Sequence, residues 1–185
     1  MARLRRIRPA LASDAAALAA IYGHHVLHGL GTFEEVPPSP EDMAGRLSAV
    51  TDRGLPYLVA EIDAQVAGLA YAGLFRPRAA YRYTVEDSVY VAPDRMGQGV
   101  GKALLGAVIA VCEGLGLRQM VAMIGDSGNA GSIGLHRACG FQAAGLLPAI
   151  GYKHERWVDV VQMRRPLNAG AEAPPDALGL TLTGH

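Results

Sequence analysis

The chain has 185 residues, half of them hydrophobic, with 17 basic and 17 acidic side chains. This length supports one domain with a buried core, and the apolar content excludes an intrinsically disordered chain. Its formal net charge of zero argues against a general nucleic-acid-binding protein, which usually carries a basic excess.

Hydrophobic periodicity and turn residues divide the first half of the chain into short strands and two helices. Apolar and polar residues alternate in the first strand, and the first helix carries Leu18, Ile21, Tyr22 and Val26 on or near one face. We expect, in chain order, an edge strand at 4–8, a helix from Ser13 or Asp14 to about His28, an extended segment at 32–36, a helix from Ser39-Pro40 to about Gly54, and a hairpin of 57–61 and 65–75 that turns at Asp63-Ala64.

The second half continues the alternation of strands and helices. We expect a polar, aromatic loop at 76–83, a strand at 84–91, a helix at 100–115, a strand at 118–124, a short helix at 129–139, and strands at 141–150 and 156–163. The order β-α-α-β-β-β-α-β-α-β-β predicts one α/β domain over 1–165, with about seven strands in a mixed sheet and about four helices on its two faces. The Ala-, Gly- and Pro-rich stretch 166–185 is expected to be a loose tail.

Targeting features and cysteines predict a cytoplasmic protein with no membrane partner. The N-terminus has the basic start of a secretion signal, but Pro9, Ser13 and Asp14 interrupt its apolar part. No apolar run approaches the ~20 residues that a membrane-spanning helix needs. Cys112 and Cys139 lack C-x-x-C spacing and are expected to be free, although the sequence leaves a disulfide open.

The stretch RMGQGVGKALL, residues 95–105, places glycine at every second position before a lysine. A nucleotide-binding P-loop would need glycine at Met96 and a hydroxyl at Ala103, so that interpretation fails. The spacing G-x-G-x-G also differs from the dinucleotide fingerprint G-x-G-x-x-G. What remains is a glycine turn whose following helix offers its first amides to a diphosphate. A plain strand-to-helix turn is the alternative.

Three histidines on the first predicted helix raise the question of a metal site. His24 and His28 lie one helical turn apart, and His25 lies between them. No third ligand is evident nearby, so we expect no metal and place these side chains at the helix surface or a pocket rim.

The segments SVYVAPDRMGQGVGKALL and GNAGSIGLHRACGF, together with the element order, resemble the GNAT superfamily of acetyl-CoA-dependent N-acetyltransferases over about residues 3–165. The segments TFEEVPPS, YTVEDSVYV and GYKHERWVDVVQM are similar to the phosphinothricin and methionine sulfoximine acetyltransferase branch. The resemblance implies the GNAT fold, acetyl-CoA as co-substrate and a homodimer. It also implies a small amino-acid-like acceptor.

The resemblance assigns the coenzyme to the glycine loop and the strand before it. Met96 replaces the arginine or glutamine usual in the family, and Arg95 is a substitute for it. Backbone amides near Val89 to Val91 would polarise the thioester carbonyl, and irregular pairing of that strand would let the pantetheine arm extend the sheet. The implied coenzyme residues are Val89, Tyr90, Val91, Arg95, Met96, Gly97, Gln98, Gly99, Val100, Gly101, Lys102 and Asn129; Asn129 is equally suited to cap a helix.

Acetyl transfer to an amine needs a base, because an alkyl ammonium has a pKa of ~10. The resemblance implies Glu86 as this base, and its alternative is a surface carboxylate. Glu86 shares a strand face with Ser88 and Tyr90; Asp87 is the rival base, but its parity places it on the apolar face or near the sheet edge. His136, four residues before Gly140-Phe141, is implied as proton donor to the leaving thiolate; its alternative is a half-exposed helical histidine.

The acceptor pocket is expected in the loops after the first helix and before Glu86. Arginine suits an anionic acceptor group, because its guanidinium binds carboxylate or phosphinate through two hydrogen bonds. The candidates are Phe33, Glu34, Phe75, Arg76, Tyr81, Arg82 and Tyr83, with solvated loop charge as the alternative for the arginines. The branch also implies that Lys153, His154 and Trp157 lie near the acceptor site and the dimer contact.

The sequence therefore predicts direct acetyl transfer in a ternary complex, since no acyl-carrying nucleophile stands out. A polyamine, an aminoglycoside or a protein N-terminus is the alternative acceptor, and the arginine-bearing loop favours none of the cationic ones. A coenzyme-A-binding sensor without turnover is the non-catalytic alternative, supported only by Met96.

Overall fold

A computed structural model describes residues 6–182 of the chain. Its strands are β1 (Arg6–Pro9), β2 (Tyr57–Ile62), β3 (Gln65–Leu74), β4 (Thr84–Val91), β5 (Gln119–Gly125), β6 (Gln142–Lys153) and β7 (Arg156–Pro166). Its helices are α1 (Ala15–His28), α2 (Pro40–Thr51), α3 (Val100–Gly114) and α4 (Ala130–Ala138). The predicted element order is confirmed; positions 4 and 5 of the expected first strand lie outside the described residues.

The strands form one seven-stranded sheet in the order β1-β2-β3-β4-β5-β7-β6. All neighbours are antiparallel except β4 and β5, which run parallel. The turn between β2 and β3 falls at Asp63 and Ala64, both with positive φ, as the predicted hairpin requires. The sheet is therefore mixed, as expected.

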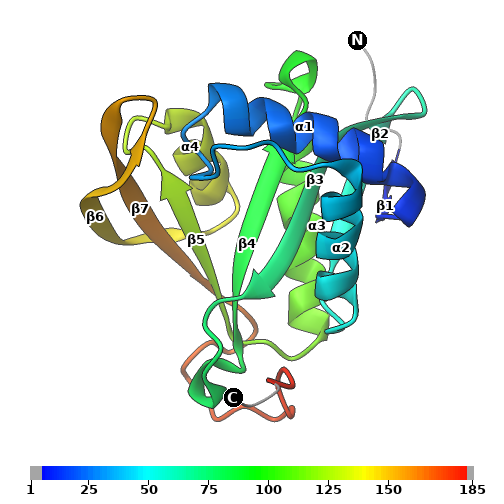
Figure 1. Cartoon of the computed structure of the whole chain (residues 1–185). Helices are drawn as coiled ribbons and strands as arrows, with labels where there is room; N and C mark the ends of the chain where they lie inside the picture. Colours follow the sequence, from blue (N-terminus) through cyan, green and yellow to red (C-terminus); the bar gives the residue numbers. More distant parts are fainter. Residues whose placement is uncertain (1–5, 183–185) are drawn as a thin grey trace.

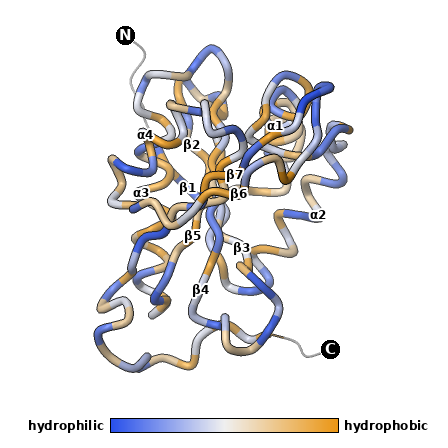
Figure 2. The backbone as a smooth tube through the Cα atoms, turned by 90° about the vertical axis from the view of Figure 1, so that its left-hand side faces the viewer, coloured by the Kyte–Doolittle hydropathy of each residue, from blue (hydrophilic) through white to orange (hydrophobic). Residues whose placement is uncertain are grey.

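Helices cover both faces of the sheet (Figure 1). On one face α1 and α2 pack through Leu18, Val26 and Leu47, among others. On the other face α3 contributes Leu104 and Val108 to a larger core, against which α4 also packs. Figure 2 shows hydrophobic residues gathered along the central strands and hydrophilic ones on the outer loops. Within residues 6–182 no helix is long and apolar enough to cross a membrane.

The residues at the start of α2 cap this helix, as the sequence predicted. The Ser39 hydroxyl accepts a hydrogen bond from the Asp42 amide at 3.1 Å, and Asp42 Oδ2 accepts from the Ser39 amide at 2.8 Å. With Pro40 as the first helical residue, this capping box satisfies amides that α2 would otherwise leave without a partner. The start of α2 was therefore predictable from local residues.

The C-terminal segment differs from the loose tail that its composition suggested. Leu167 is completely buried, and Arg118 donates hydrogen bonds to the carbonyls of Gly170 and Ala173 at 3.0 and 2.7 Å. The Tyr83 hydroxyl donates to the Ala177 carbonyl at 2.8 Å. Composition missed this packing because the contacts use backbone carbonyls, which every residue has.

Candidate active site

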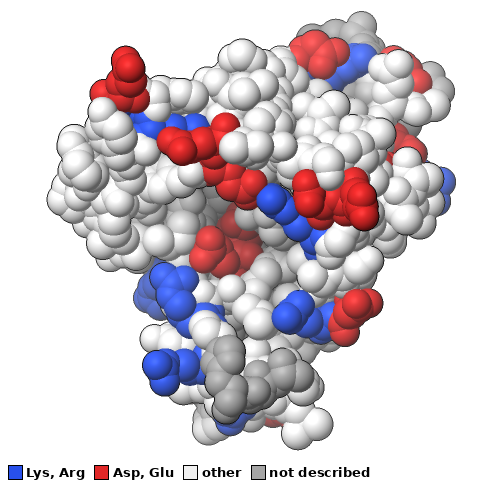
Figure 3. Space-filling model, in the orientation of Figure 1, with Lys and Arg blue, Asp and Glu red and all other residues white. Residues whose placement is uncertain are grey.

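A cleft opens where β4 and β5 diverge. The two strands pair only from Thr84–Gln119 to Glu86–Val121, and beyond that point they separate (Figure 1). The cleft has a volume of about 950 Å³ and is lined by every residue of β4 from Glu86 to Val91. In Figure 3 the centre of this face is hollowed, and acidic side chains lie in the hollow.

The irregular pairing that was expected for β4 is found on its β5 side and not on its β3 side. Between β3 and β4 the register runs without a shift from Gly68–Val91 to Leu74–Val85. The predicted disruption is therefore absent from that pairing and is supplied by the divergence from β5. From Asp87 onward the β5-facing edge of β4 borders the cleft, where an extended chain can align with it.

The glycine loop and the start of α3 form one end of the cleft. Gly97 and Gly99 have φ values of 74° and 80°, a left-handed conformation that costs other residues about 1–2 kcal/mol. The first hydrogen bond of α3 runs from the Ala103 amide to the Gly99 carbonyl, so the amides of Val100, Gly101 and Lys102 precede it. Val100, Gly101 and Lys102 line the cleft, so their amides lie where the predicted diphosphate site requires them.

Side chains of this loop divide between the cleft and the surface. Arg95, Met96 and Lys102 line the cleft, and Met96 is 59% exposed. Arg95 also pairs with Asp94, with Nε 3.1 Å from Oδ2. Gln98 does not line the cleft, because its amide nitrogen donates to the Asp94 carbonyl at 3.0 Å.

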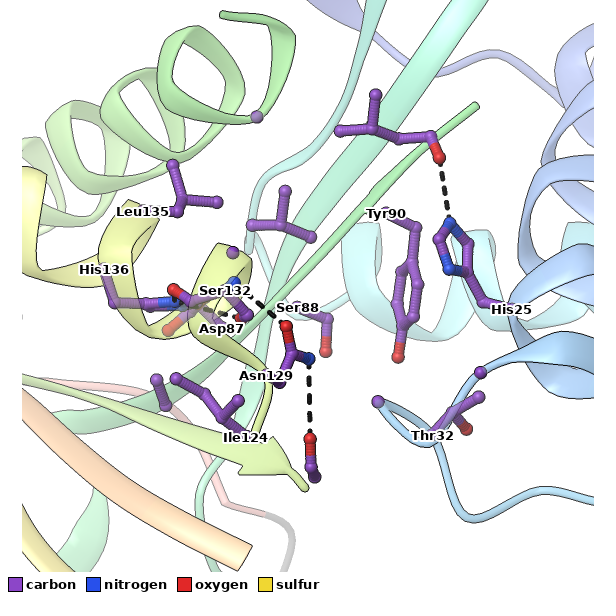
Figure 4. A pocket seen from close by; sticks show the side chains of 18 of the residues that line it. His25, Thr32, Asp87, Ser88, Tyr90, Ile124, Asn129, Ser132, Leu135 and His136 are labelled. Atoms are coloured by element: carbon purple, nitrogen blue, oxygen red, sulfur yellow. Dashed lines mark hydrogen bonds and ion pairs between the residues drawn. The ribbon is translucent and has the colours of Figure 1, made fainter. Parts of the chain in front are cut away.

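Asn129 lies at the cleft and caps α4. Its Oδ1 accepts a hydrogen bond from the Ser132 amide at 3.1 Å, and its Nδ2 is 3.5 Å from the Gly125 carbonyl (Figure 4). The capping role, which was one of the two predicted for this residue, is therefore confirmed. Its position on the lining keeps it available as a ligand contact as well.

A buried ion pair joins β4 to α4 on the cleft wall. Asp87 and His136 are 6% and 4% exposed, and His136 Nε2 lies 3.0 Å from Asp87 Oδ2 (Figure 4). The other ring nitrogen, Nδ1, is 2.7 Å from the Ser132 carbonyl. Because a carbonyl and a carboxylate are both acceptors, this arrangement favours the charged imidazole, in which both ring nitrogens donate.

The electrostatics agree with a charged imidazole. Burial alone lowers the pKa of His136, but the hydrogen bond and the charge of Asp87 outweigh it and raise that pKa above its usual 6.5. The half-exposed helical histidine, which was the alternative for His136, is wrong. The parity of Asp87 pointed to the apolar face, but it gave no sign that a histidine 49 residues away would pair with it there.

Glu86 lies at the open floor of the cleft. Its side chain is 32% exposed, and its Oε2 is 4.0 Å from Arg76 Nη1. Burial raises the pKa of Glu86, the positive charge of Arg76 opposes the rise, and the negative charge of Asp87 adds to it. A partly buried carboxylate beside solvent can accept a proton more readily than a free surface glutamate.

Of the predicted acceptor residues, Phe33 and Arg76 line the cleft. Glu34 instead accepts two hydrogen bonds from the guanidinium of Arg46, at 2.8 and 2.9 Å, and one from the Tyr22 hydroxyl at 2.7 Å. Its place in the acceptor pocket is thus not supported. The loop places the Glu34 side chain against Arg46 of α2, and the loop sequence alone does not predict this contact.

The remaining candidates of the loop 75–83 also point elsewhere. The Phe75 ring contacts Tyr81 edge to face at 5.5 Å, and Arg82 Nη1 donates to the Ala79 carbonyl at 3.0 Å. Tyr83 binds the C-terminal segment through its hydroxyl. None of these four residues lines the cleft. The other side chains of this loop contact the loop itself or the C-terminal segment, and Arg76 alone of the predicted loop residues lines the cleft.

Several lining residues were not predicted. Tyr71 of β3 is paired in register with Ser88, and both border the cleft beside Glu86. The alternation of β4 placed Ser88 on the Glu86 face, so that residue had a sequence signal. Tyr71 had none, because the register between β3 and β4 depends on the loop that joins them.

Of the final hairpin, Val160 of β7 lines the cleft, whereas the predicted residues Lys153, His154 and Trp157 do not. Lys153 is 2% exposed, and its Nζ donates to the Thr32 carbonyl at 2.8 Å, which ties β6 to the loop after α1. Burial lowers the pKa of Lys153. Trp157, by contrast, is 66% exposed. Lys153 is therefore a structural contact of a loop that borders the site.

The three histidines of α1 do not assemble a metal site. His25 Nε2 donates to the Val91 carbonyl at 2.9 Å, and the rings of His24 and His28 lie 4.8 Å apart. Among residues 6–182, no group of three potential metal ligands from His, Cys, Asp and Glu is present. Burial lowers the pKa of His25, so its neutral form holds the end of β4 against α1.

Comparison with known proteins agrees with this geometry. The chain is 56% identical over 163 residues to phosphinothricin N-acetyltransferase of Alcaligenes faecalis, a match that covers 88% of this chain and 83% of that protein. It is 41% identical to the L-methionine sulfoximine/L-methionine sulfone acetyltransferase of Pseudomonas aeruginosa, covering 91% and 98% of the two chains.

A solved structure shares the whole architecture. The phosphinothricin acetyltransferase of Sinorhizobium meliloti, crystallised in complex with acetyl-CoA, superposes with a TM-score of 0.91 at 45% identity and 96% coverage of both chains. The sequence model of the acetyltransferase (GNAT) family matches residues 24–141, which include the glycine loop and both members of the Asp87–His136 pair. The chain therefore belongs to the acetyltransferase (GNAT) family.

Proposed function

We propose that this protein is an acetyl-CoA-dependent enzyme that acetylates the primary amine of a small amino-acid-like acceptor by direct transfer. One observation carries the proposal. Glu86 and Arg76 lie 4.0 Å apart on the floor of a cleft whose other end is the amide cradle of α3. A base and an anion-binding group thus face the position where a coenzyme held by that cradle would present its acetyl group.

The proposed role of Glu86 is to accept the proton of the acceptor ammonium. Burial raises its pKa toward the operating range, which makes it a stronger base than an exposed glutamate. The positive charge of Arg76 opposes the rise in this pKa and so favours the ionised carboxylate. Its partial exposure lets a water molecule bridge carboxylate and amine.

The proposed role of His136 is to supply a proton to the departing thiolate. Its imidazole lies on the cleft wall, and the hydrogen bond and charge of Asp87 favour its protonated form. Delivery requires one of its two hydrogen bonds, to Asp87 or to Ser132, to be exchanged for one to the sulfur. The cradle of α3, Arg95, Lys102 and Asn129 would hold the coenzyme, which supplies the acetyl group when bound.

The proposed acceptor is zwitterionic with an additional anionic or polar head. Arg76 offers hydrogen bonds to a carboxylate or phosphinate, and Phe33 offers an apolar contact beside it. The named activities of the relatives, on phosphinothricin and on methionine sulfoximine or sulfone, have this acceptor chemistry. The arginine makes a polyamine or an aminoglycoside unfavourable as acceptor.

We propose a cytoplasmic homodimer that takes a small-molecule amine and binds neither nucleic acid nor membrane. β6 is an edge strand, and Leu146, Ile150 and Tyr152 on it are 52%, 56% and 58% exposed. Exposed apolar residues along an edge favour pairing with a second copy. Cys112 and Cys139 are free thiols, in keeping with a reducing compartment.

The test is release of coenzyme A thiol from acetyl-CoA with phosphinothricin, methionine sulfoximine, the common amino acids and several polyamines. Turnover with the first two at a kcat/KM above that of the polyamines is expected. Turnover with polyamines alone would overturn the acceptor assignment. Binding of acetyl-CoA by calorimetry without turnover of any acceptor would favour the sensor or an acceptor outside the panel, such as a protein N-terminus.

A further inference from the structure

The C-terminal segment 167–182, here called the strap, follows β7 and packs at the end of the sheet where β4 begins. Figure 1 shows it beside the loop that precedes β4. Its first residues are firmly attached: Leu167 is fully buried, and Asn168 Nδ2 donates to the carbonyls of Glu113 and Leu117, both at 3.0 Å. The GNAT family match ends at residue 141, so the strap lies outside it.

A buried arginine holds the middle of the strap. Arg118 is 6% exposed, and its guanidinium donates to the carbonyls of Gly170, Ala173 and Pro174 at 3.0, 2.7 and 3.5 Å. A buried charge is costly unless hydrogen bonds satisfy it. The strap supplies those acceptors, and the proposed chemistry gives Arg118 no other role.

The far end of the strap binds the loop 75–83, here called the acceptor loop. The Tyr83 hydroxyl donates to the Ala177 carbonyl at 2.8 Å, and the Leu180 amide donates to the Arg82 carbonyl, also at 2.8 Å. Both contacts fall on the last two residues of the loop, immediately before β4. The strap thus holds the side chain of Tyr83 and the backbone of Arg82, two residues that were predicted to bind substrate.

The acceptor loop connects these contacts to the cleft. Tyr81 packs edge to face on Phe75 at 5.5 Å, and the Arg76 guanidinium lies over the Phe75 ring at 4.4 Å from its centre. Arg76 then reaches Glu86 at 4.0 Å. A continuous set of contacts therefore runs from the strap to the arginine that faces the acceptor.

We propose that the strap is a positioning element that fixes the acceptor loop and thereby sets the affinity for the acceptor. Arg118 anchors the strap, and Tyr83 transmits its position. The inference rests on the proposed function, because it assigns the acceptor to Arg76. Coenzyme binding uses the opposite end of the cleft and is independent of the strap.

Three proteins test the proposal beside the full chain. One ends at Asn168, which keeps the first two residues of the strap, including the buried Leu167, and removes the rest. One ends at Leu182 and is the matched control. The third is Tyr83→Phe, which removes a single hydroxyl. Hydrogen exchange of the peptide covering 75–83 is measured on each, together with KM for methionine sulfoximine and the dissociation constant of acetyl-CoA.

The chain that ends at Asn168 is expected to exchange the 75–83 amides about ten-fold faster, because loop opening costs less without the strap. Its acceptor KM and that of Tyr83→Phe rise about five-fold, the effect of losing one hydrogen bond of roughly 1 kcal/mol. The acetyl-CoA affinity of both, and every value for the chain ending at Leu182, stay within about two-fold of the full chain.

Unchanged exchange of the acceptor loop in the chain ending at Asn168 would overturn the proposal. So would faster exchange with an unchanged acceptor KM, since the strap would then hold a loop that does not serve the acceptor. If the full chain turned over no acceptor at all, the proposed function would fail, and the exchange measurement would still decide whether the strap holds the loop.

Discussion

The two walls of the cleft are built in different ways. The proposed coenzyme wall consists mainly of backbone at helix starts: the turn 95–99 with the first amides of α3, and the capped start of α4. The acceptor wall consists of side chains from separate loops, which are held by distant contacts such as Lys153 to Thr32 and Tyr83 to Ala177. Local sequence determines the first wall, whereas long-range packing determines the second.

The largest expected effect comes from Glu86, where the two walls meet. Glu86→Gln keeps the shape of the side chain but removes the proposed base, so kcat should fall about 10²- to 10⁴-fold. The dissociation constant of acetyl-CoA should be unchanged, because the cradle lies elsewhere. Thiol release and calorimetry on Glu86→Gln and on the exposed control Glu41→Gln measure this; a fall of less than three-fold in kcat would remove Glu86 as base.

The Asp87–His136 pair, which fastens α4 to β4, gives the next effect. Because Asp87 raises the pKa of His136, the stability from the pair is fully present below about pH 6.5 and is lost as pH rises through the raised pKa. Asp87→Asn should lower the free energy of unfolding by about 2 kcal/mol at pH 6 and by less at pH 9.

Urea unfolding at both pH values measures this difference, with the exposed Asp52→Asn as control. A loss of stability equal at pH 6 and pH 9 would mean that the imidazole is not charged by Asp87. A loss that grows with pH would contradict the direction assigned to the pKa of His136.

Arg76 tests the acceptor wall alone. Arg76→Gln should raise the acceptor KM about ten-fold or more, since hydrogen bonds to charged groups contribute about 1.5–3 kcal/mol. Without its charge the pKa of Glu86 rises further, so the acid limb of kcat/KM should move to higher pH. Arg78→Gln in the same loop is the control. Equal acceptor KM values for the two variants would show that Arg76 does not bind the acceptor.

Gly99 tests the coenzyme wall with the smallest expected effect. Gly99→Ala forces a side chain into φ 80°, at a cost of about 1 kcal/mol, and should weaken acetyl-CoA binding about five-fold. Gly106→Ala, within α3 and with open space around a Cβ, should bind acetyl-CoA normally and stabilise the helix. Calorimetric measurement of acetyl-CoA binding to both variants distinguishes the effect of the backbone conformation at Gly99 from a general effect of replacing a glycine.

The contrast between local and long-range contacts also explains which features could be predicted from the sequence and which could not. Element order, the capped helices and the coenzyme loop followed from local patterns, and Asn129 and Glu86 were placed correctly at the cleft. Side-chain partners across long distances did not follow. Glu34 looked like a pocket residue but binds Arg46, and the tail looked loose because carbonyl contacts to Arg118 have no residue signature.

The most direct test of this account is steady-state thiol release with methionine sulfoximine, varying both substrates, for Arg76→Gln and Gly99→Ala. The account predicts that Arg76→Gln raises KM for the acceptor alone and that Gly99→Ala raises KM for acetyl-CoA alone. If Arg76→Gln weakened acetyl-CoA as strongly as the acceptor, or if the unaltered protein released no thiol with this acceptor, the division of the cleft into two walls with these ligands would be contradicted.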